Sequence, residues 1–159
     1  MNRMRKVLIA DDEVKVGQLV KRLIQWDRLG LTCIGLVTDG QTAYEKILSE
    51  SPDIVITDIR MPVLTGLEMI QKASEQGVKC HFIVVSGYKY FDYAQKALKY
   101  GVEDYLLKPI DEDELNRQLQ KIVAEEEQRE DKQQQVDQIE KKLEDSKYLR
   151  HKEFLRQIL

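Results

Sequence analysis

Five short apolar segments recur along the chain, separated by longer segments in which apolar residues repeat at helical spacing. The short segments are residues 7–10, 33–37, 54–56, 82–85 and 102–107. Four of the five are apolar almost throughout and rich in β-branched residues, which is typical of strands that helices cover on both faces. The alternation predicts five βα units arranged around a parallel sheet.

The segments between the strands carry apolar stripes typical of helices that pack one face onto a sheet. Gly30 and Gly101 follow two of these helices, where a positive φ is expected, and Asp39 and Asp111 precede two others as caps. The stripes consist of Val16, Leu19, Val20, Leu23 and Ile24; Ala43, Ile47 and Leu48; Leu67, Ile70 and Ala73; Ala94, Ala97 and Leu98; and Leu115, Leu119, Ile122 and Val123.

The composition changes near residue 125, from mixed apolar and polar to mostly Glu, Gln, Lys and Asp. We therefore predict an α/β domain over residues 1–124 and a charged helical linker over residues 125–159. A heptad can be drawn through Leu115, Ile122, Arg129, Val136 and Leu143, with Ile139 between the last two, and it gives apolar seams only at its two ends. Any coiled coil here would be weak in its middle. The chain stops within an apolar helical pattern, so we expect the linker to lead to a further, output domain.

Charge and cysteine content narrow the function classes. The 159 residues carry a formal net charge of -3, which gives no electrostatic reason to bind nucleic acid or a membrane surface. Two cysteines are too few for a disulfide framework or a cysteine metal site. Apolar runs are too short for a signal peptide or a membrane span. We expect a cytoplasmic protein that binds no membrane.

Polar residues follow four of the five predicted strands. Asp11 and Asp12 end the first strand, Asp58 the third, Ser86 the fourth and Lys108 the fifth. Because the carboxyl ends of parallel strands meet at one edge of a sheet, these side chains should lie close together. Three carboxylates at one edge repel one another, and a divalent cation with oxygen ligands relieves the repulsion. Mg²⁺ is the expected ion, because it is often shared between carboxylates and phosphate oxygens.

An ammonium, a hydroxyl and three carboxylates suit phosphoryl transfer, in which catalysis rests on positioning and on charge neutralisation. An aspartate can itself be the nucleophile and form an acyl phosphate. Each residue alone also has a simpler explanation: Asp11 and Asp12 as a helix cap, Ser86 as part of a turn, Lys108 as a strand end. Asp58 is harder to explain structurally, because an acid that ends an apolar strand needs a partner.

Taken together, these segments strongly resemble the receiver domains of two-component response regulators. The match runs in order and spacing over residues 4 to 124. The segments that carry it are Asp11-Asp12, Thr57-Asp58-Ile59-Arg60-Met61-Pro62 with Gly66, Ser86-Gly87-Tyr88, and Tyr105-Leu106-Leu107-Lys108-Pro109. The resemblance implies a doubly wound, flavodoxin-like sheet of order 2-1-3-4-5, phosphorylated by a sensor histidine kinase.

The resemblance also assigns roles to the acidic residues. It implies that Asp58 is the phosphoacceptor. Asp12, Asp58 and the backbone carbonyl of Arg60 would bind Mg²⁺ directly, with Asp11 acting mostly through water. The domain would assist its own phosphorylation without being an enzyme in the usual sense.

The remaining site residues receive roles in switching. Lys108 would pair with the phosphoryl oxygens, and the Lys108-Pro109 peptide bond is expected to be cis. Ser86 would bond the phosphoryl group and, in moving, let Tyr105 swing inward. The residues alone leave Tyr105 open to a simpler interpretation, because an aromatic side chain in a buried strand usually belongs to the core.

Finer features resemble receivers that are joined by a helical linker to an AraC-type helix-turn-helix domain. These features are Trp26 before Gly30-Leu31, the segment that starts at Ser86, and residues 91–97. DNA would then be bound only through that output domain, and a homodimer could form through the receiver face or the helical tail.

Three other functions remain to be separated. A phosphohydrolase with an aspartyl nucleophile would need a second acid two residues after Asp58, where Arg60 stands. A flavodoxin-like electron carrier would need a hydroxyl-rich, phosphate-binding loop after the first strand, and no such loop follows residues 7–10. A degenerate receiver, acting only as an interaction and dimerisation module, usually lacks one of the acids or the lysine.

Overall fold

The computed structural model describes residues 3–87 and 102–158. Their elements alternate strand and helix, as the apolar pattern predicts. In chain order they are β1 (Arg5–Ala10), α1 (Val14–Leu23), α2 (Trp26–Leu29), β2 (Leu31–Val37), α3 (Gly40–Glu50), β3 (Ile54–Asp58), α4 (Gly66–Glu75), β4 (His81–Ser86), β5 (Val102–Leu107) and α6 (Glu112–Ile158). The helix predicted around Ala94 and Ala97, and Gly101 after it, fall outside the described residues.

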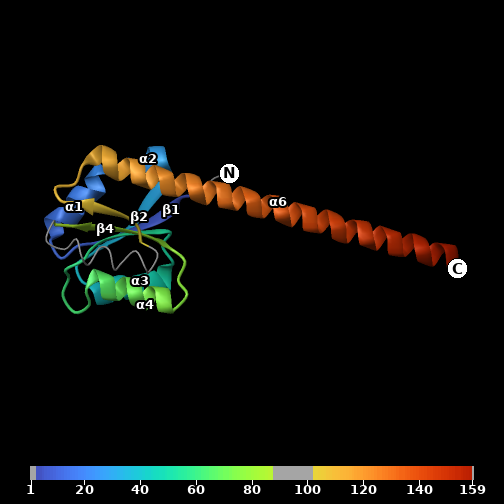
Figure 1. Ribbon diagram of the computed structural model, residues 1–159, viewed down its shortest axis with the longest axis horizontal. Coiled ribbons are helices and arrows are strands. Elements are labelled where there is room, and N and C mark those ends of the chain that lie inside the picture. Colours follow the sequence, from blue (N-terminus) through green and yellow to red (C-terminus); the bar gives the residue numbers. More distant parts are fainter. Residues whose placement is uncertain (1–2, 88–101, 159) are drawn as a thin grey trace. The chain divides into compact units, whose positions relative to one another are not determined.

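The five strands form one parallel sheet in the order β2-β1-β3-β4-β5. This confirms the predicted doubly wound, flavodoxin-like topology with a C-terminal helical extension. Figure 1 shows α3 and α4 against one face of the sheet and α1 against the other. Strand β1 lies between β2 and β3. Its alternate residues face opposite ways: Leu8 joins the cluster that includes α3 and α4, whereas Ile9 faces Gly17 of α1.

Two residues of the predicted stripes are exposed, which corrects those predictions. Leu19 of α1 is 39% exposed and Leu48 of α3 is 50% exposed. In α3 the buried positions are 40, 43, 44 and 47, so Leu48 is one residue step, about 100° around the helix, beyond Ile47. Tyr44, four residues before Leu48, is buried instead. The Nζ atom of Lys72 in α4 lies 5.0 Å from the centre of the Tyr44 ring.

The element ends also differ from the prediction. Strand β2 begins at Leu31 rather than Cys33, and β3 continues to Asp58 rather than ending at Ile56. The short helix α2 was not predicted; Gly30 ends it with a φ of 67°, as expected of a glycine after a helix. Both predicted caps are confirmed: Asp39 accepts from the backbone N–H of Thr42, and Asp111 from that of Glu114.

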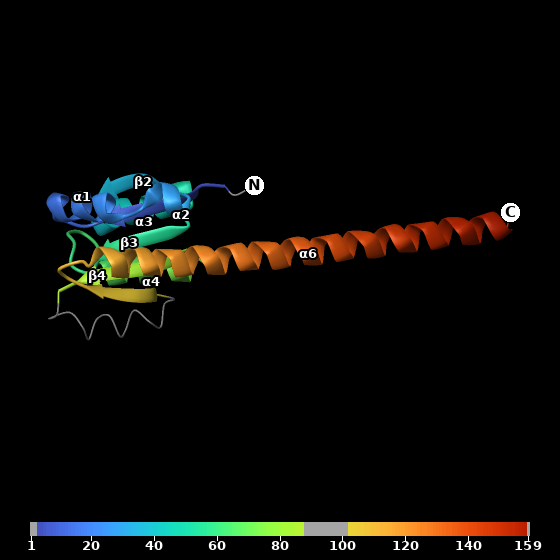
Figure 2. The same ribbon diagram turned by 90° about the horizontal axis from the view of Figure 1, so that it is seen from above.

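The chain divides into two compact units, Met1–Gln120 and Lys121–Leu159, here called the N-terminal unit and the tail. Helix α6 supplies the last helical turns of the first unit and the described residues of the second. Figure 2 shows α6 coloured from orange to red along the sequence. The tail is helical over its described residues, as predicted. The predicted domain boundary at residue 124 stays a prediction.

Candidate functional site

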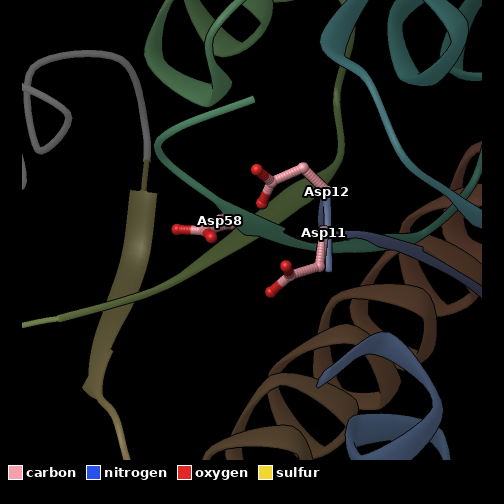
Figure 3. Close-up of side chains that lie close together, drawn as sticks. All are labelled: Asp11, Asp12 and Asp58. Carbon is pink, nitrogen blue, oxygen red and sulfur yellow. The ribbon is translucent and has the colours of Figure 1, made fainter. Parts of the chain in front are cut away.

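Three aspartates meet at the carboxyl edge of the sheet. Asp11 and Asp12 follow β1, and Asp58 ends the neighbouring strand β3. One carboxylate oxygen from each lies within 4.8 Å of the other two, and Figure 3 shows the three side chains around one small space. Asp11 and Asp58 are buried, with 5% and 7% exposure, whereas Asp12 is exposed. The structure thus brings together the three acids that the predicted strand ends carry.

Asp58 is held in place on both sides of its carboxylate. Its Oδ1 accepts a hydrogen bond from the Ile59 backbone N–H at 2.7 Å, and its Oδ2 lies 3.1 Å from Lys108 Nζ. The start of α4 packs directly against the backbone of Asp58, and this approach requires glycine at position 66. A Cβ on Gly66 would lie 2.0 Å from the Asp58 backbone oxygen. Asp58 is therefore fixed by close backbone packing as well as by charge.

The pKa of Asp11 is raised well above that of an ordinary aspartate. Burial is the main reason that its pKa is raised to about 6, and the charge of Asp58 adds to the effect. A hydrogen bond from the Glu13 backbone N–H, at 2.9 Å, and the ammonium of Lys108 oppose the rise. A second cation at this edge would lower the cost of keeping all three acids ionised.

Lys108 is the cation already present. Its Nζ lies 3.1 Å from Asp58 Oδ2 and 3.4 Å from Asp11 Oδ2, so it bridges the first and third strands from the end of the fifth. Burial alone would lower the pKa of Lys108, but the charges of Asp58 and Asp11 outweigh it and raise the pKa. The peptide bond from Lys108 to Pro109 is cis, which confirms the prediction.

Ser86 and Tyr105 lie beside this cluster, on β4 and β5. Ser86 is fully buried, and within the described residues its Oγ accepts or donates no hydrogen bond of normal geometry. The half-buried Tyr105 donates from its hydroxyl to the Gly87 carbonyl oxygen at 3.2 Å. Burial raises the pKa of Tyr105, and the nearby Ser86 side chain partly offsets the rise. A buried hydroxyl without a full partner suits a site that receives an additional oxygen atom.

The donor set fits a divalent cation such as Mg²⁺. All three side chains are oxygen donors, one of them exposed to solvent, and Mg²⁺ prefers one or two carboxylates together with waters and phosphate oxygens. Burial of like charges gives the cluster a physical reason to bind a cation. The ligand role predicted for the Arg60 backbone carbonyl stays a prediction; the Arg60 side chain is exposed.

Comparison with known proteins settles the family. Residues 7–120 match the response regulator receiver domain family. The chain belongs to this family. Its receiver domain is 36% identical to the receiver domain of AraT, a response regulator from Geobacillus stearothermophilus, with a TM-score of 0.76 over 80% of this chain and 98% of that one.

Two curated relatives are named as transcriptional regulators. The chain is 46% identical over 122 residues to the uncharacterized transcriptional regulatory protein YesN of Bacillus subtilis, covering 77% of this chain and 33% of YesN. It is 35% identical over 120 residues to the transcriptional regulatory protein HptR of Staphylococcus aureus, covering 76% of this chain and 47% of HptR. The chain thus spans a third to a half of the length of these relatives.

Sequence reasoning missed the backbone groups of this receiver site. The N–H groups of Glu13 and Ile59 each bind a site carboxylate, and neither residue's side chain type signals that role. Their only signal is position, immediately after a strand end that carries an acid. No helix among the described residues has the length and apolar character needed to cross a membrane.

Proposed function

We propose that this receiver domain accepts a phosphoryl group on Asp58 from a sensor histidine kinase. Mg²⁺ would be held by Asp12, Asp58 and the Arg60 backbone carbonyl, with Asp11 acting mostly through water. The observation that carries the proposal is the position of Lys108 Nζ, within 3.4 Å of both Asp11 and Asp58. An ammonium held against the acceptor carboxylate can neutralise the charge of an incoming phosphoryl group.

The transfer itself is a displacement at phosphorus. A carboxylate oxygen of Asp58 forms a bond to phosphorus while the bond from phosphorus to the kinase histidine nitrogen breaks, and that nitrogen keeps the electron pair. Mg²⁺ held by these residues would neutralise charge on the phosphoryl oxygens. Lys108 then moves from the Asp58 carboxylate to a phosphoryl oxygen, and Asp58 needs no proton transfer because its carboxylate is the nucleophile.

Ser86 and Tyr105 are the proposed link between phosphorylation and the surface. The buried Ser86 hydroxyl gains a phosphoryl oxygen as a partner, which draws β4's end toward Asp58. Tyr105 would exchange its bond to the Gly87 carbonyl for a position closer to Ser86. Phosphorylation then shifts an equilibrium between two arrangements of this edge, rather than creating a new one.

The output of the switch is proposed to be transcription. The relatives YesN and HptR are named as transcriptional regulatory proteins and are longer than this chain. We infer that the tail leads to a DNA-binding domain, of AraC type by the resemblance of Trp26 and residues 86–97 to that subfamily. The protein would act in the cytoplasm, where the kinase domain of a sensor and the DNA are both accessible.

The decisive experiment is incubation with Mg²⁺ and acetyl phosphate, followed by intact-protein mass spectrometry. The wild type should gain one phosphoryl group, and an Asp58→Asn variant should gain none. Asp137→Asn, an equivalent change at an exposed tail acid, should behave as wild type. Omitting Mg²⁺ should abolish the gain in the wild type and in Asp137→Asn.

A degenerate receiver is the second candidate, in which the domain serves only as an interaction module. It predicts no phosphoryl gain on the wild type from either acetyl phosphate or a phosphorylated kinase. Equal labelling of the wild type and Asp58→Asn would also reject Asp58 as the acceptor. The complete set of acids and the lysine favours the phosphorylated form.

A further inference from the structure

Strand β2 is the outermost strand on one side of the sheet, and it carries no charged residue. Its seven residues, 31–37, include neither a charge nor a proline. Among the residues that the structure describes, only β1 pairs with it. Positions 32–36 are half-buried or exposed. An uncharged, largely aliphatic edge of this length is a template for pairing with another strand, and natural proteins usually protect such edges.

The β2 edge is protected by a bulge and by a lysine from α3. β5, the other outermost strand, carries Asp104 within its own length. In β2 the register with β1 shifts between Val7 and Leu8, which leaves Ile34 as an extra residue. Lys46 of α3 reaches this bulge, and its Nζ donates a hydrogen bond to the Ile34 carbonyl oxygen at 3.1 Å. The Ile34 carbonyl therefore already has a partner, and an ammonium group lies on the edge strand.

Two neighbouring residues hold Lys46 in this position. Glu50, one turn later in α3, pairs with the Lys46 Nζ at 2.9 Å. Gly35 leaves room for the lysine, since a Cβ at residue 35 would lie 3.1 Å from Nζ and 3.4 Å from Cε. Gly35 does not have a positive φ. Glycine therefore provides space for Lys46 at this position rather than an unusual backbone conformation.

We propose that Lys46 keeps this edge of β2 closed to strand pairing with the same edge of a second copy of the chain. Two copies offer each other identical aliphatic edges, so a pair related by a twofold axis is the arrangement that Lys46 opposes. Such a pair would break the bond from Lys46 to Ile34 in both copies and bring two ammonium groups to one seam. The proposal concerns the sheet edge and does not depend on the proposed function of Asp58.

The first test measures self-association of the full chain by sedimentation velocity over a range of concentrations, without Mg²⁺ or a phosphodonor. Lys46→Met keeps an aliphatic side chain but removes the charge and the donor. This variant should lower the Kd of self-association at least about tenfold relative to the wild type. Lys15→Met, which removes the same charge from an exposed position of α1, should change the Kd less than about twofold. Equal self-association of the two variants would overturn the proposal.

Gly35→Ala displaces the lysine without removing it. The added Cβ requires the end of Lys46 to move away from Ile34, so the Kd should fall by about threefold. Cooperative urea unfolding shows that each variant is folded. If Lys46→Met does not unfold cooperatively, a folded Gly35→Ala decides the question. A Kd of Gly35→Ala equal to that of the wild type would then overturn the proposal.

Hydrogen exchange locates the contact within the sheet. In Lys46→Met, the amides of residues 31–37 should exchange more slowly at high protein concentration than at low, because amides of a paired edge gain acceptors. Residues 54–58, in the central strand β3, should exchange at the same rate at both concentrations. Self-association that protects other segments but leaves residues 31–37 unchanged would show that the β2 edge is not the surface that Lys46 protects.

Discussion

Each strand of the N-terminal unit pairs with strands distant in sequence. Two side-chain hydrogen bonds of the tail instead join residues three or four positions apart. Val7 pairs with Cys33 on one side and Ile54 on the other. In the tail, Gln133 donates to Asp137 at 3.0 Å and Arg129 bonds Glu126. Pairing of distant strands therefore brings distant acids into one site, while these tail hydrogen bonds link neighbouring turns of one helix. Substitutions in the N-terminal unit should therefore lower the free energy of unfolding more than substitutions at exposed positions of the tail.

The largest expected effect is at Gly66, where two distant backbone segments meet. Gly66→Ala places a Cβ 2.0 Å from the Asp58 backbone oxygen, so the loop or the strand must move. We expect a loss of about 3 kcal/mol or more in the free energy of unfolding, measured by urea denaturation. Gly17→Ala is the matched control, since its Cβ would meet Leu36 at 3.8 Å and alanine favours helix. An unchanged stability in Gly66→Ala would contradict the close approach.

Asn116 joins the start of α6 to the connection after α1 and should give the next largest effect. Its Nδ2 donates to the Leu23 carbonyl oxygen and its Oδ1 accepts from the Gln25 backbone N–H, each at 2.8 Å. Asn116→Ala removes the partner of both partly buried backbone groups, and we expect a loss of about 2 kcal/mol in the free energy of thermal or urea unfolding. Gln120→Ala, which removes one exposed contact to Arg28, should cost less than about 0.5 kcal/mol. Similar losses in the two variants would argue against a special role for Asn116.

Asp39 caps α3 through a local hydrogen bond from the Thr42 backbone N–H, and its removal should have a smaller effect. Asp39→Ala removes the cap of α3 and should cost about 1 kcal/mol. Hydrogen bonds from the backbone and hydroxyl of Thr42 lower the pKa of Asp39. Its charge-dependent stabilisation is therefore present above the unfolded-state pKa of about 3.9 and is lost as pH falls through the lower folded-state pKa. Unfolding curves between pH 6 and pH 2 should show this loss in the wild type.

Asp39→Asn is the control for the charge. Asparagine also caps helices, so most of the stability at pH 6 should remain. The portion of the acid-induced loss that belongs to residue 39 should disappear. If the asparagine variant loses stability with falling pH as steeply as the wild type, the Asp39 carboxylate does not contribute.

The smallest effect is expected in the tail. Leu143→Ala should change the free energy of unfolding of the N-terminal unit in a monomeric sample by less than about 0.5 kcal/mol, because Leu143 is exposed. Leu8 of β1 is fully buried in the core cluster that includes α3 and α4. Leu8→Ala should lower the free energy of unfolding by about 2–5 kcal/mol. Fluorescence of Trp26 during urea unfolding measures both. A large loss in Leu143→Ala would mean that the two regions are not independent.

Much of the fold followed from local patterns. Short apolar segments alternating with helical stripes predicted the parallel sheet, because strands covered on both faces need apolar residues on both. Leu19 and Leu48 were wrongly placed on packing stripes because periodicity leaves the edges of a stripe undefined. Which of two adjacent apolar residues is buried depends on how far the helix is turned on the sheet, which only packing decides.

The sequence alone determined the identity of the candidate site: acids at the ends of β1 and β3, a hydroxyl at the end of β4 and a lysine at the end of β5. These ends lie at the one edge where parallel strands end together. The tertiary structure decided how these groups interact. It placed Lys108 against both Asp11 and Asp58, buried Asp11 enough to raise its pKa to about 6, and left Asp12 exposed. These properties depend on distances across three strands and on the depth of burial, which spacing along one chain does not specify.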